Sequence, residues 1–302
     1  MIRNFSSSIN NPALCMVLAM AIVGVIDNFI VIIARNSSLW QFLCLRAVVA
    51  LPLVLLLSSV GIGTIYPKKL WATILRNSLI AVAMLFYFFC LSIMPISQAL
   101  AGLFTSPIFI LIINAVLLKK RIGLFRVFAV AAGFTGTLLV LEVRPANLHW
   151  LNLIPIISGM FYALGSIATR RYCEKESTLS MLAILLIIQF FMGFFVMAFL
   201  VAFPLPHFTS NNFLFSVWDS NFLKAMPLII LQSVGAIFGV GLIIRSYQIG
   251  EPSYVAVYEY SVFIFGPLFA WFALKQTISA IQIVGIIFVV VAGSIITLQN
   301  QE

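Results

Sequence analysis

Ten apolar stretches, each close to the length needed to cross a lipid bilayer, occupy most of this 302-residue chain. A spanning helix needs about 20 apolar residues, because each residue adds about 1.5 Å to a path of about 30 Å. The stretches predict helices near residues 13–33, 39–60, 71–91, 97–118, 123–141, 150–170, 178–202, 222–247, 253–274 and 278–298. Composition agrees, since 63% of the residues are hydrophobic, 8% are charged and the mean hydropathy is +1.16. We therefore expect an all-α integral membrane protein with ten transmembrane helices.

The ten stretches divide into two sets of five, over residues 1–142 and 143–302. Because five is an odd number, the second set must enter the membrane in the opposite orientation to the first. A shift of 156 residues pairs four positions of the two halves: Ser97 with Ser253, Lys120 with Gln276, Arg126 with Gln282 and Ala129 with Gly285. The pattern predicts two inverted five-helix repeats, an arrangement that many transporters use to build a site reachable from either side.

The basic residues predict the orientation of the chain. With the N-terminus inside, 12 of the 17 basic residues lie in inner loops or at inner helix ends: Arg3, Lys68, Lys69, Arg76, Lys119, Lys120, Arg121, Arg126, Arg170, Arg171, Lys175 and Arg245. Four lie outside: Arg35, Arg144, Lys224 and Lys275. Positive charge gathers on the cytoplasmic side, so we expect a multi-pass protein of the cell inner membrane with both termini cytoplasmic.

Other readings of the composition are disfavoured. The net charge of +9 comes from these short loops, without a basic face for nucleic acid. The four cysteines, Cys15, Cys44, Cys90 and Cys173, are scattered without metal-site spacing, so we expect no metal and no cofactor. The run from Ala13 to Ala34 is too long for a cleavable signal and is expected to remain as the first span.

Three stretches of the sequence resemble the drug/metabolite transporter superfamily, EamA type. They are Phe42–Arg46 at the start of the second helix, the run from Ile93 through Pro95, Ser97, Ala99 and Pro107 to Arg121, and Arg245–Ser253 leading into Tyr258–Glu259–Tyr260. The resemblance covers nearly the whole chain and implies two five-helix repeats and a transport function. Ile74–Arg76 and Gly133–Gly136 also resemble rickettsial S-adenosylmethionine uptake carriers.

One position departs from the family pattern. The acidic residue that usually closes the fourth helix is replaced by Lys120, and Gln276 occupies the corresponding place in the second half. No role of that acid is therefore carried over to this chain.

Two opposite charges are expected at one depth. Asp27 lies about six residues before the outer end of the first helix, and Arg46 about seven residues after the outer start of the second. Ionisable groups inside a membrane need a partner or a water-filled cavity. The two residues either form a buried pair that fixes packing, or serve as an outer gate or a site for the ammonium and carboxylate of a zwitterion.

Glu259 is predicted near the inner side of the ninth helix, between Tyr258 and Tyr260. Desolvation disfavours the charged form of a carboxyl there, so Glu259 suits the loading and release of a proton. The alternative is a structural pairing with Arg245. Arg76, near the inner interface, is expected to extend its side chain to the lipid headgroups.

Neutral polar groups complete the candidate path. They are Tyr87, Gln98, Asn114, Tyr162, Gln189 and Gln232, of which most should only bridge neighbouring helices. Pro107 and Pro267 fall within the fourth and ninth helices and are candidate hinges, because proline removes an intrahelical hydrogen bond.

The leading hypothesis is a secondary transporter that moves a small metabolite, such as an amino acid or related zwitterion, by alternating access. Its expected partners are that substrate, the lipid bilayer and, if Glu259 titrates, protons. An S-adenosylmethionine uptake or exchange carrier is the first alternative. An integral-membrane enzyme is the second, disfavoured because Asp27 and Glu259 lie on opposite sides and His149 and His207 are far apart in sequence. A receptor would leave the repeat unexplained.

Overall fold

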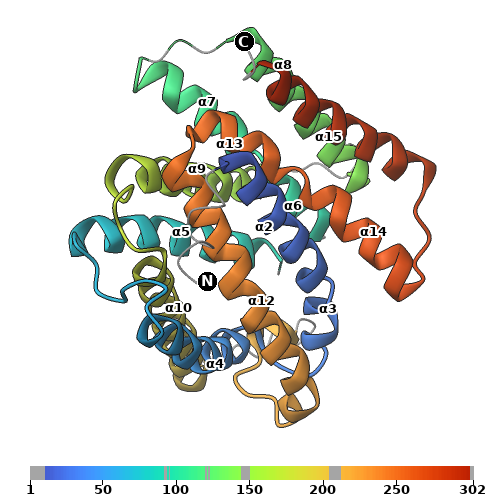
Figure 1. The fold of residues 1–302 in the computed structure, drawn as a ribbon. Helices are drawn as coiled ribbons and strands as arrows, with labels where there is room; N and C mark the ends of the chain where they lie inside the picture. The colour runs from blue at the N-terminus through green and yellow to red at the C-terminus, as the bar shows by residue number, and fades with distance from the viewer. Residues whose placement is uncertain are drawn as a thin grey trace.

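The computed structural model describes residues 11–91, 94, 96–119, 121, 123–143, 150–203 and 212–299, and this part of the chain is helical without a β-strand (Figure 1). Its longer helices are α2 (Pro12–Asp27), α4 (Leu39–Ser59), α5 (Leu70–Cys90), α6 (Ile96–Leu103), α7 (Ser106–Val116), α8 (Leu124–Val140), α9 (Ile154–Tyr172), α10 (Thr178–Ala202), α12 (Phe222–Ile249), α13 (Pro252–Glu259), α14 (Val262–Leu274) and α15 (Ala280–Gln299). Short elements are α3 (Ile30–Ile33), the 3₁₀ helix η3 (Trp150–Leu153) and α11 (Asn212–Phe215). The all-α prediction is confirmed.

Eight segments of the described chain are long and apolar enough to cross a membrane. They are Pro12–Ile33, Leu39–Ser59, Leu70–Cys90, Ile96–Val116, Thr178–Ala202, Phe222–Ile249, Pro252–Leu274 and Ala280–Leu298. The apolar helix α8 is shorter, with 17 residues, and α9 lies outside this set. Each of the ten predicted stretches contains helix, and the number of ten membrane crossings stays a prediction.

Two of the predicted helices are interrupted at related places. α6 gives way to α7 at Phe104–Thr105, and α13 gives way to α14 at Tyr260–Ser261. These breaks are 156 residues apart, the shift that aligns the two halves of the sequence. At each break a hydroxyl donates to the carbonyl oxygen three residues earlier: Thr105 to Gly102 and Ser261 to Tyr258, both at 2.6 Å.

The two candidate hinge prolines lie at different positions relative to the helix breaks. Pro107 lies in the first turn of α7, directly after the first break, where a missing N–H costs nothing. Pro267 lies inside α14, six residues after the break, and the helix continues through it. Hinge motion at either proline stays a prediction.

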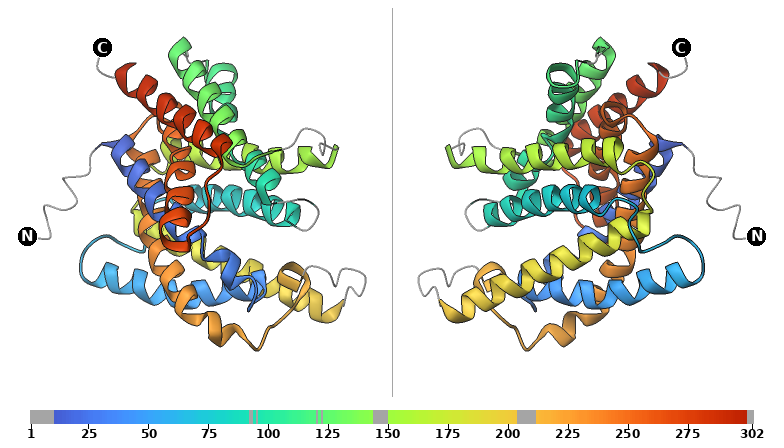
Figure 2. Two further views of the ribbon diagram at one scale, coloured as in Figure 1. Left: turned by 90° about the vertical axis from the view of Figure 1, so that its right-hand side faces the viewer. Right: turned by 90° about the vertical axis from the view of Figure 1, so that its left-hand side faces the viewer.

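Helices of the two halves pack in pairs. Figure 2 shows α5 alongside α9, α4 alongside α10, and α8 close to α15. α8 and α15 approach through glycine: a Cβ on Gly136 would lie 2.7 Å from the carbonyl oxygen of Gly285, so a larger residue does not fit there. The helix α12 packs against both α2 and α4, and α9 packs against α5, α6 and α7.

Candidate substrate and coupling site

Several of the predicted polar residues, together with Tyr247, form two groups. The Glu259 cluster consists of Glu259, Tyr162, Tyr247 and Arg76, and the Asp27 cluster consists of Asp27, Arg46 and Tyr87. A buried polar atom needs a hydrogen-bond partner to offset the loss of its hydration. We therefore compare the hydrogen bonds that the side chains of each cluster make.

Glu259 is the last residue of α13 and is 2% exposed. Its carboxylate oxygen Oε1 accepts hydrogen bonds from the Tyr247 hydroxyl at 2.8 Å and the Tyr162 hydroxyl at 3.1 Å. The tyrosines come from α12 and α9, so three helices meet at this carboxylate. No ion pair joins Glu259 to Arg245 in the described part of the chain, so tyrosine hydroxyls take the place of the predicted structural partner.

Arg76 lies inside the protein, contrary to the expectation that it reaches the headgroups. It is 3% exposed, its Nε donates to Thr169 Oγ1 at 2.9 Å, and its Nη1 donates to Asn77 Oδ1 at 2.7 Å. Its positive charge acts on the hydroxyls of Tyr162 and Tyr247. The helix α10 covers this region, since Asn77 Nδ2 donates to the Met181 carbonyl at 3.0 Å, and burial under a neighbouring helix prevents snorkelling.

The Asp27 cluster is more open. Asp27 ends α2 and is exposed, while Arg46 on α4 and Tyr87 on α5 are half-buried. The charge of Asp27 interacts with Arg46 and acts on the Tyr87 hydroxyl. Within the described chain the two charges are close without forming an ion pair, and the Nε atom of Arg46 is buried without a hydrogen-bond partner. One donor of the Arg46 guanidinium is therefore unsatisfied inside the described part of the protein.

Gln232 of α12 has a similar unpaired group. It is 3% exposed, and its Oε1 atom has no hydrogen-bond partner among the described residues. α12 packs against α2 through Gly235, whose added Cβ would meet Ile26, and shares a core cluster with α4 through Ile229. Gln232 lies between these two contacts along α12, level with Asp27 and Arg46. Gln189 and Asn114 also carry buried unpaired amide atoms, on α10 and α7.

The two clusters lie at different depths. On α2, Gly24 approaches Gly266 of α14, whereas Val17, further back, packs in the core cluster that contains Val257 and Tyr258. Glu259 is therefore near the level of Val17, and Asp27 lies ten residues further along α2, roughly 15 Å away at 1.5 Å per residue. The placement of the two residues on opposite sides of the membrane stays a prediction.

Two further predicted site residues are Tyr258 on α13 and Gln98 on α6. The Tyr258 hydroxyl bonds to the Tyr254 hydroxyl at 3.2 Å and to Thr297 Oγ1 at 2.8 Å, away from Glu259. Gln98 is buried on α6, with 8% of its surface exposed. Their roles in binding substrate stay predictions.

Sequence reasoning missed several residues that the fold brings together. Tyr247 was not singled out, although a tyrosine buried in a membrane helix needs a partner for its hydroxyl. Arg126 of α8 forms an ion pair with Glu251 and donates to Ser253 at 2.8 Å, tying α8 to the start of α13. No group of three or more His, Cys, Asp or Glu residues suited to a metal ion occurs in the described part of the chain. His149 and His207 lie outside it.

Comparison with known sequences identifies the family. The EamA-like transporter family matches residues 11–142 and again residues 149–298. The chain belongs to this family, within the drug/metabolite transporter superfamily. The eight apolar helices of spanning length in the described residues fit a multi-span membrane protein, and the resemblance to this transporter family found in the sequence is confirmed.

Relatives of this chain are named after different substrates. A riboflavin transporter of Rhizobium johnstonii is 28% identical over 51% of this chain and 50% of its own length. An S-adenosylmethionine uptake transporter of Rickettsia prowazekii is 24% identical over 76% of this chain and 71% of its own length. The chain thus spans about half the length of the first relative. A solved crystal structure with 16% identity covers 96% of both chains at a TM-score of 0.71 and shares the fold.

Proposed function

We propose that this EamA-like protein is a secondary transporter that moves a small zwitterionic metabolite, an amino acid or S-adenosylmethionine, across the cell inner membrane by alternating access. The unpaired Nε of Arg46 beside the accessible carboxylate of Asp27 carries the proposal. A charged donor and a charged acceptor held near one another without pairing suit a ligand that has both an ammonium and a carboxylate.

We further propose ten membrane spans in two inverted repeats, residues 1–142 and 143–302, with both termini cytoplasmic. The matched helix breaks at Phe104–Thr105 and Tyr260–Ser261 support the repeat. The packing pairs also support it, because α5 with α9 corresponds to α12 with α2 when the two halves are exchanged. Interrupted helices at a repeat interface are the usual binding elements of such carriers.

Coupling to protons is assigned to Glu259. Among the described residues the Glu259 carboxyl accepts hydrogen bonds from two neutral hydroxyls and forms no ion pair, so it can gain or lose a proton without breaking one. Proton uptake would weaken the acceptor that holds α9 and α12 to the end of α13. Protonation and movement of these helices would then be linked.

The test is uptake into sealed proteoliposomes, comparing S-adenosylmethionine, amino acids and riboflavin. Arg46→Gln should raise the substrate concentration for half-maximal uptake at least tenfold, about 1.4 kcal/mol, because a charge-assisted hydrogen bond is lost. Arg35→Gln is the matched control, an exposed arginine at the same end of the bundle, and should leave uptake unchanged. Zwitterion uptake that is insensitive to Arg46→Gln would contradict the assignment.

Riboflavin is the second candidate substrate, favoured by the similarity to the Rhizobium riboflavin transporter. Riboflavin has no ammonium or carboxylate, so its uptake should depend little on Arg46. Transport of riboflavin with Arg46→Gln unchanged, and no transport of zwitterions, would favour this candidate over the first.

A further inference from the structure

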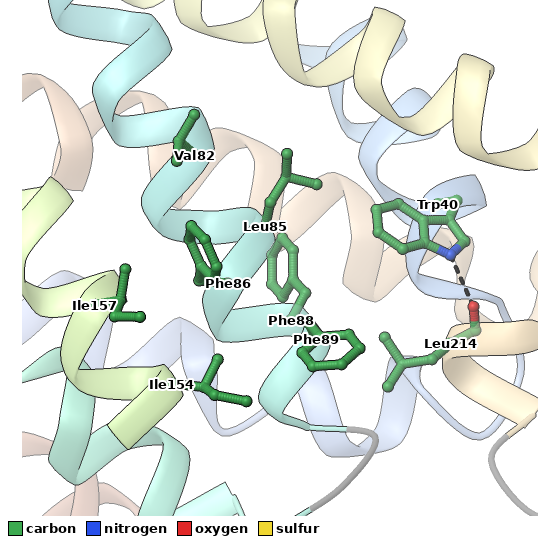
Figure 3. A pocket seen from close by; sticks show the side chains of 9 residues that line it. All are labelled: Trp40, Val82, Leu85, Phe86, Phe88, Phe89, Ile154, Ile157 and Leu214. Atoms are coloured by element: carbon green, nitrogen blue, oxygen red, sulfur yellow. Dashed lines mark hydrogen bonds between the residues drawn. The ribbon is translucent and has the colours of Figure 1, made fainter. Parts of the chain in front are cut away.

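A crevice of about 580 Å³ lies on one side of α5 (Figure 3). Its walls come from four helices, α4, α5, α9 and α11, and are lined by Trp40, Val82, Leu85, Phe86, Phe88, Phe89, Ile154, Ile157 and Leu214. The volume is within the range of about 300–1,000 Å³ that ligand pockets occupy.

The lining offers no free polar side chain. Its only polar side-chain atom, the Nε1 of Trp40, already donates to the Leu214 carbonyl oxygen at 2.7 Å, as Figure 3 shows. Pockets for polar metabolites contain a few polar groups that orient the ligand. A zwitterion would lose its hydration here without compensation.

The crevice also faces away from the Asp27 cluster. Successive residues of a helix turn by about 100°, so Tyr87 points more than about 120° away from the direction shared by Val82, Phe86 and Phe89. The Tyr87 hydroxyl on α5 interacts electrostatically with the carboxylate of Asp27. The crevice is therefore on the outer side of α5, separated by that helix from the candidate substrate site.

The mouth of the crevice continues into the apolar surface of the bundle. Phe89 is 54% exposed, Leu85 38% and Ile157 37%, whereas Trp40 and Leu214 at the far wall are buried. Val82, Leu85 and Phe89 belong to the candidate span Leu70–Cys90, whose length and apolar composition suit the hydrocarbon region of a membrane. The environment that such a mouth meets is lipid acyl chains.

We propose that this crevice binds an acyl chain of a bilayer lipid, which lies between α5 and α9 on one side and Trp40 and Leu214 on the other. Apolar walls, a satisfied indole N–H and an opening within a membrane span fit a hydrocarbon chain. The proposal goes beyond the transport function, because it concerns a site that does not face the substrate cluster.

Trp40 reports occupancy directly. The full-length protein has five tryptophans, and replacing Trp71, Trp150, Trp218 and Trp271 with Phe leaves Trp40 as the single reporter. This protein is reconstituted into bilayers of phosphatidylcholine with or without bromine atoms on the acyl chain, a contact quencher of tryptophan. We expect brominated lipid to lower Trp40 emission at least twofold, and iodide in the aqueous phase to have little effect.

A filled crevice separates specific binding from ordinary contact with surrounding lipid. In the same background, Val82→Phe with Ile157→Phe should occupy the space and at least halve the quenching by brominated lipid. Leu75→Phe is the control, an exposed position on α5 outside the crevice, and should leave quenching unchanged. Helical circular dichroism and a single gel-filtration peak establish that each variant is folded.

Two results would overturn the proposal. Strong quenching by iodide with little quenching by brominated lipid would show a water-filled crevice. Equal quenching by brominated lipid in the parent and the filled variant would show that Trp40 contacts only the lipid around the protein. Neither result depends on which substrate is transported.

Discussion

The two helix breaks share a backbone hydrogen-bond pattern but differ in their side chains, above all in one ionisable residue. At both breaks a hydroxyl residue, Thr105 or Ser261, bonds to the carbonyl three residues earlier at 2.6 Å. The residue two positions before that hydroxyl is Leu103 in the first half and Glu259 in the second. The breaks also meet, because the Tyr260 hydroxyl donates to the Phe104 carbonyl at 3.3 Å.

The comparison of Leu103 with Glu259 distinguishes the residues that form a helix break from a residue that we expect to act in transport. A broken membrane helix must satisfy its freed carbonyl groups internally, and both halves do so with the same hydroxyl bond. The first half does this without a carboxylate. A helix break of this kind therefore does not require a carboxylate, and we expect the buried Glu259, with its two tyrosine donors, to have a role other than forming the break.

The largest expected effect comes from making the second break like the first. Glu259→Leu should reduce uptake driven by a pH gradient more than tenfold, because the proposed proton carrier is removed. The matched control is Leu103→Met, at the corresponding position, which should leave uptake unchanged. Proteoliposome uptake measures both, and full activity of Glu259→Leu would show that the asymmetry between the breaks is not functional.

The next effect concerns the close packing of the first break against α9. A Cβ on Gly102 would lie 2.4 Å from the Cβ of Pro155, so Gly102→Ala must push α6 and α9 apart. We expect a loss of about 2 kcal/mol of unfolding free energy, measured as a fall in thermal midpoint. Gly293→Ala on α15 is the control, since no heavy atom lies within 4 Å of its added Cβ. Equal midpoints for the two variants would contradict this packing.

Removing either hydroxyl at the breaks, that of Thr105 or that of Ser261, should lower the free energy of unfolding by a smaller amount, equal for the two. Thr105→Val and Ser261→Ala each remove the bond to the carbonyl three residues earlier, and each should cost about 1 kcal/mol. Thr135→Val serves as the control, because its hydroxyl bonds to the Ala131 carbonyl on an exposed part of α8. Thermal midpoints that differ strongly between Thr105→Val and Ser261→Ala would show that the breaks are stabilised differently.

The smallest effect is expected where the breaks touch. Tyr260→Phe removes only the 3.3 Å bond to the Phe104 carbonyl and keeps the buried ring, so the cost should be about 0.5 kcal/mol. A loss as large as that of Gly102→Ala would mean that this contact, rather than the packing of α6 on α9, holds the breaks together. The thermal midpoint again decides.

The sequence predicted the helices well and their breaks poorly. Span length and apolar content placed the helical stretches, because each helix satisfies its own backbone. The breaks depend on hydroxyls such as Thr105 and Ser261, which are equally compatible with an unbroken helix. Proline was the visible signal, and it accompanies the first break, at Pro107, but lies within an intact α14 at Pro267.

The sequence singled out the ionisable residues of the candidate site, but it did not identify the side chains that hydrogen-bond to them. Asp27, Arg46 and Glu259 stand out because ionisable residues are rare in apolar spans. Arg76 was placed at the headgroups from its position near a helix end, yet Thr169 and Asn77 hold it inside. Tyr247 reaches Glu259 from another helix, and contacts between helices do not follow from spacing along one chain.

The most direct test of the account is the movement of protons with substrate. A pH-sensitive dye is enclosed in proteoliposomes, and a transported zwitterion is added to the parent and to Glu259→Gln without an imposed gradient. We predict that substrate changes the internal pH only with the parent, while Glu259→Gln still exchanges labelled for unlabelled substrate. Proton movement of equal size in both proteins would contradict the assignment of Glu259 as the coupling residue.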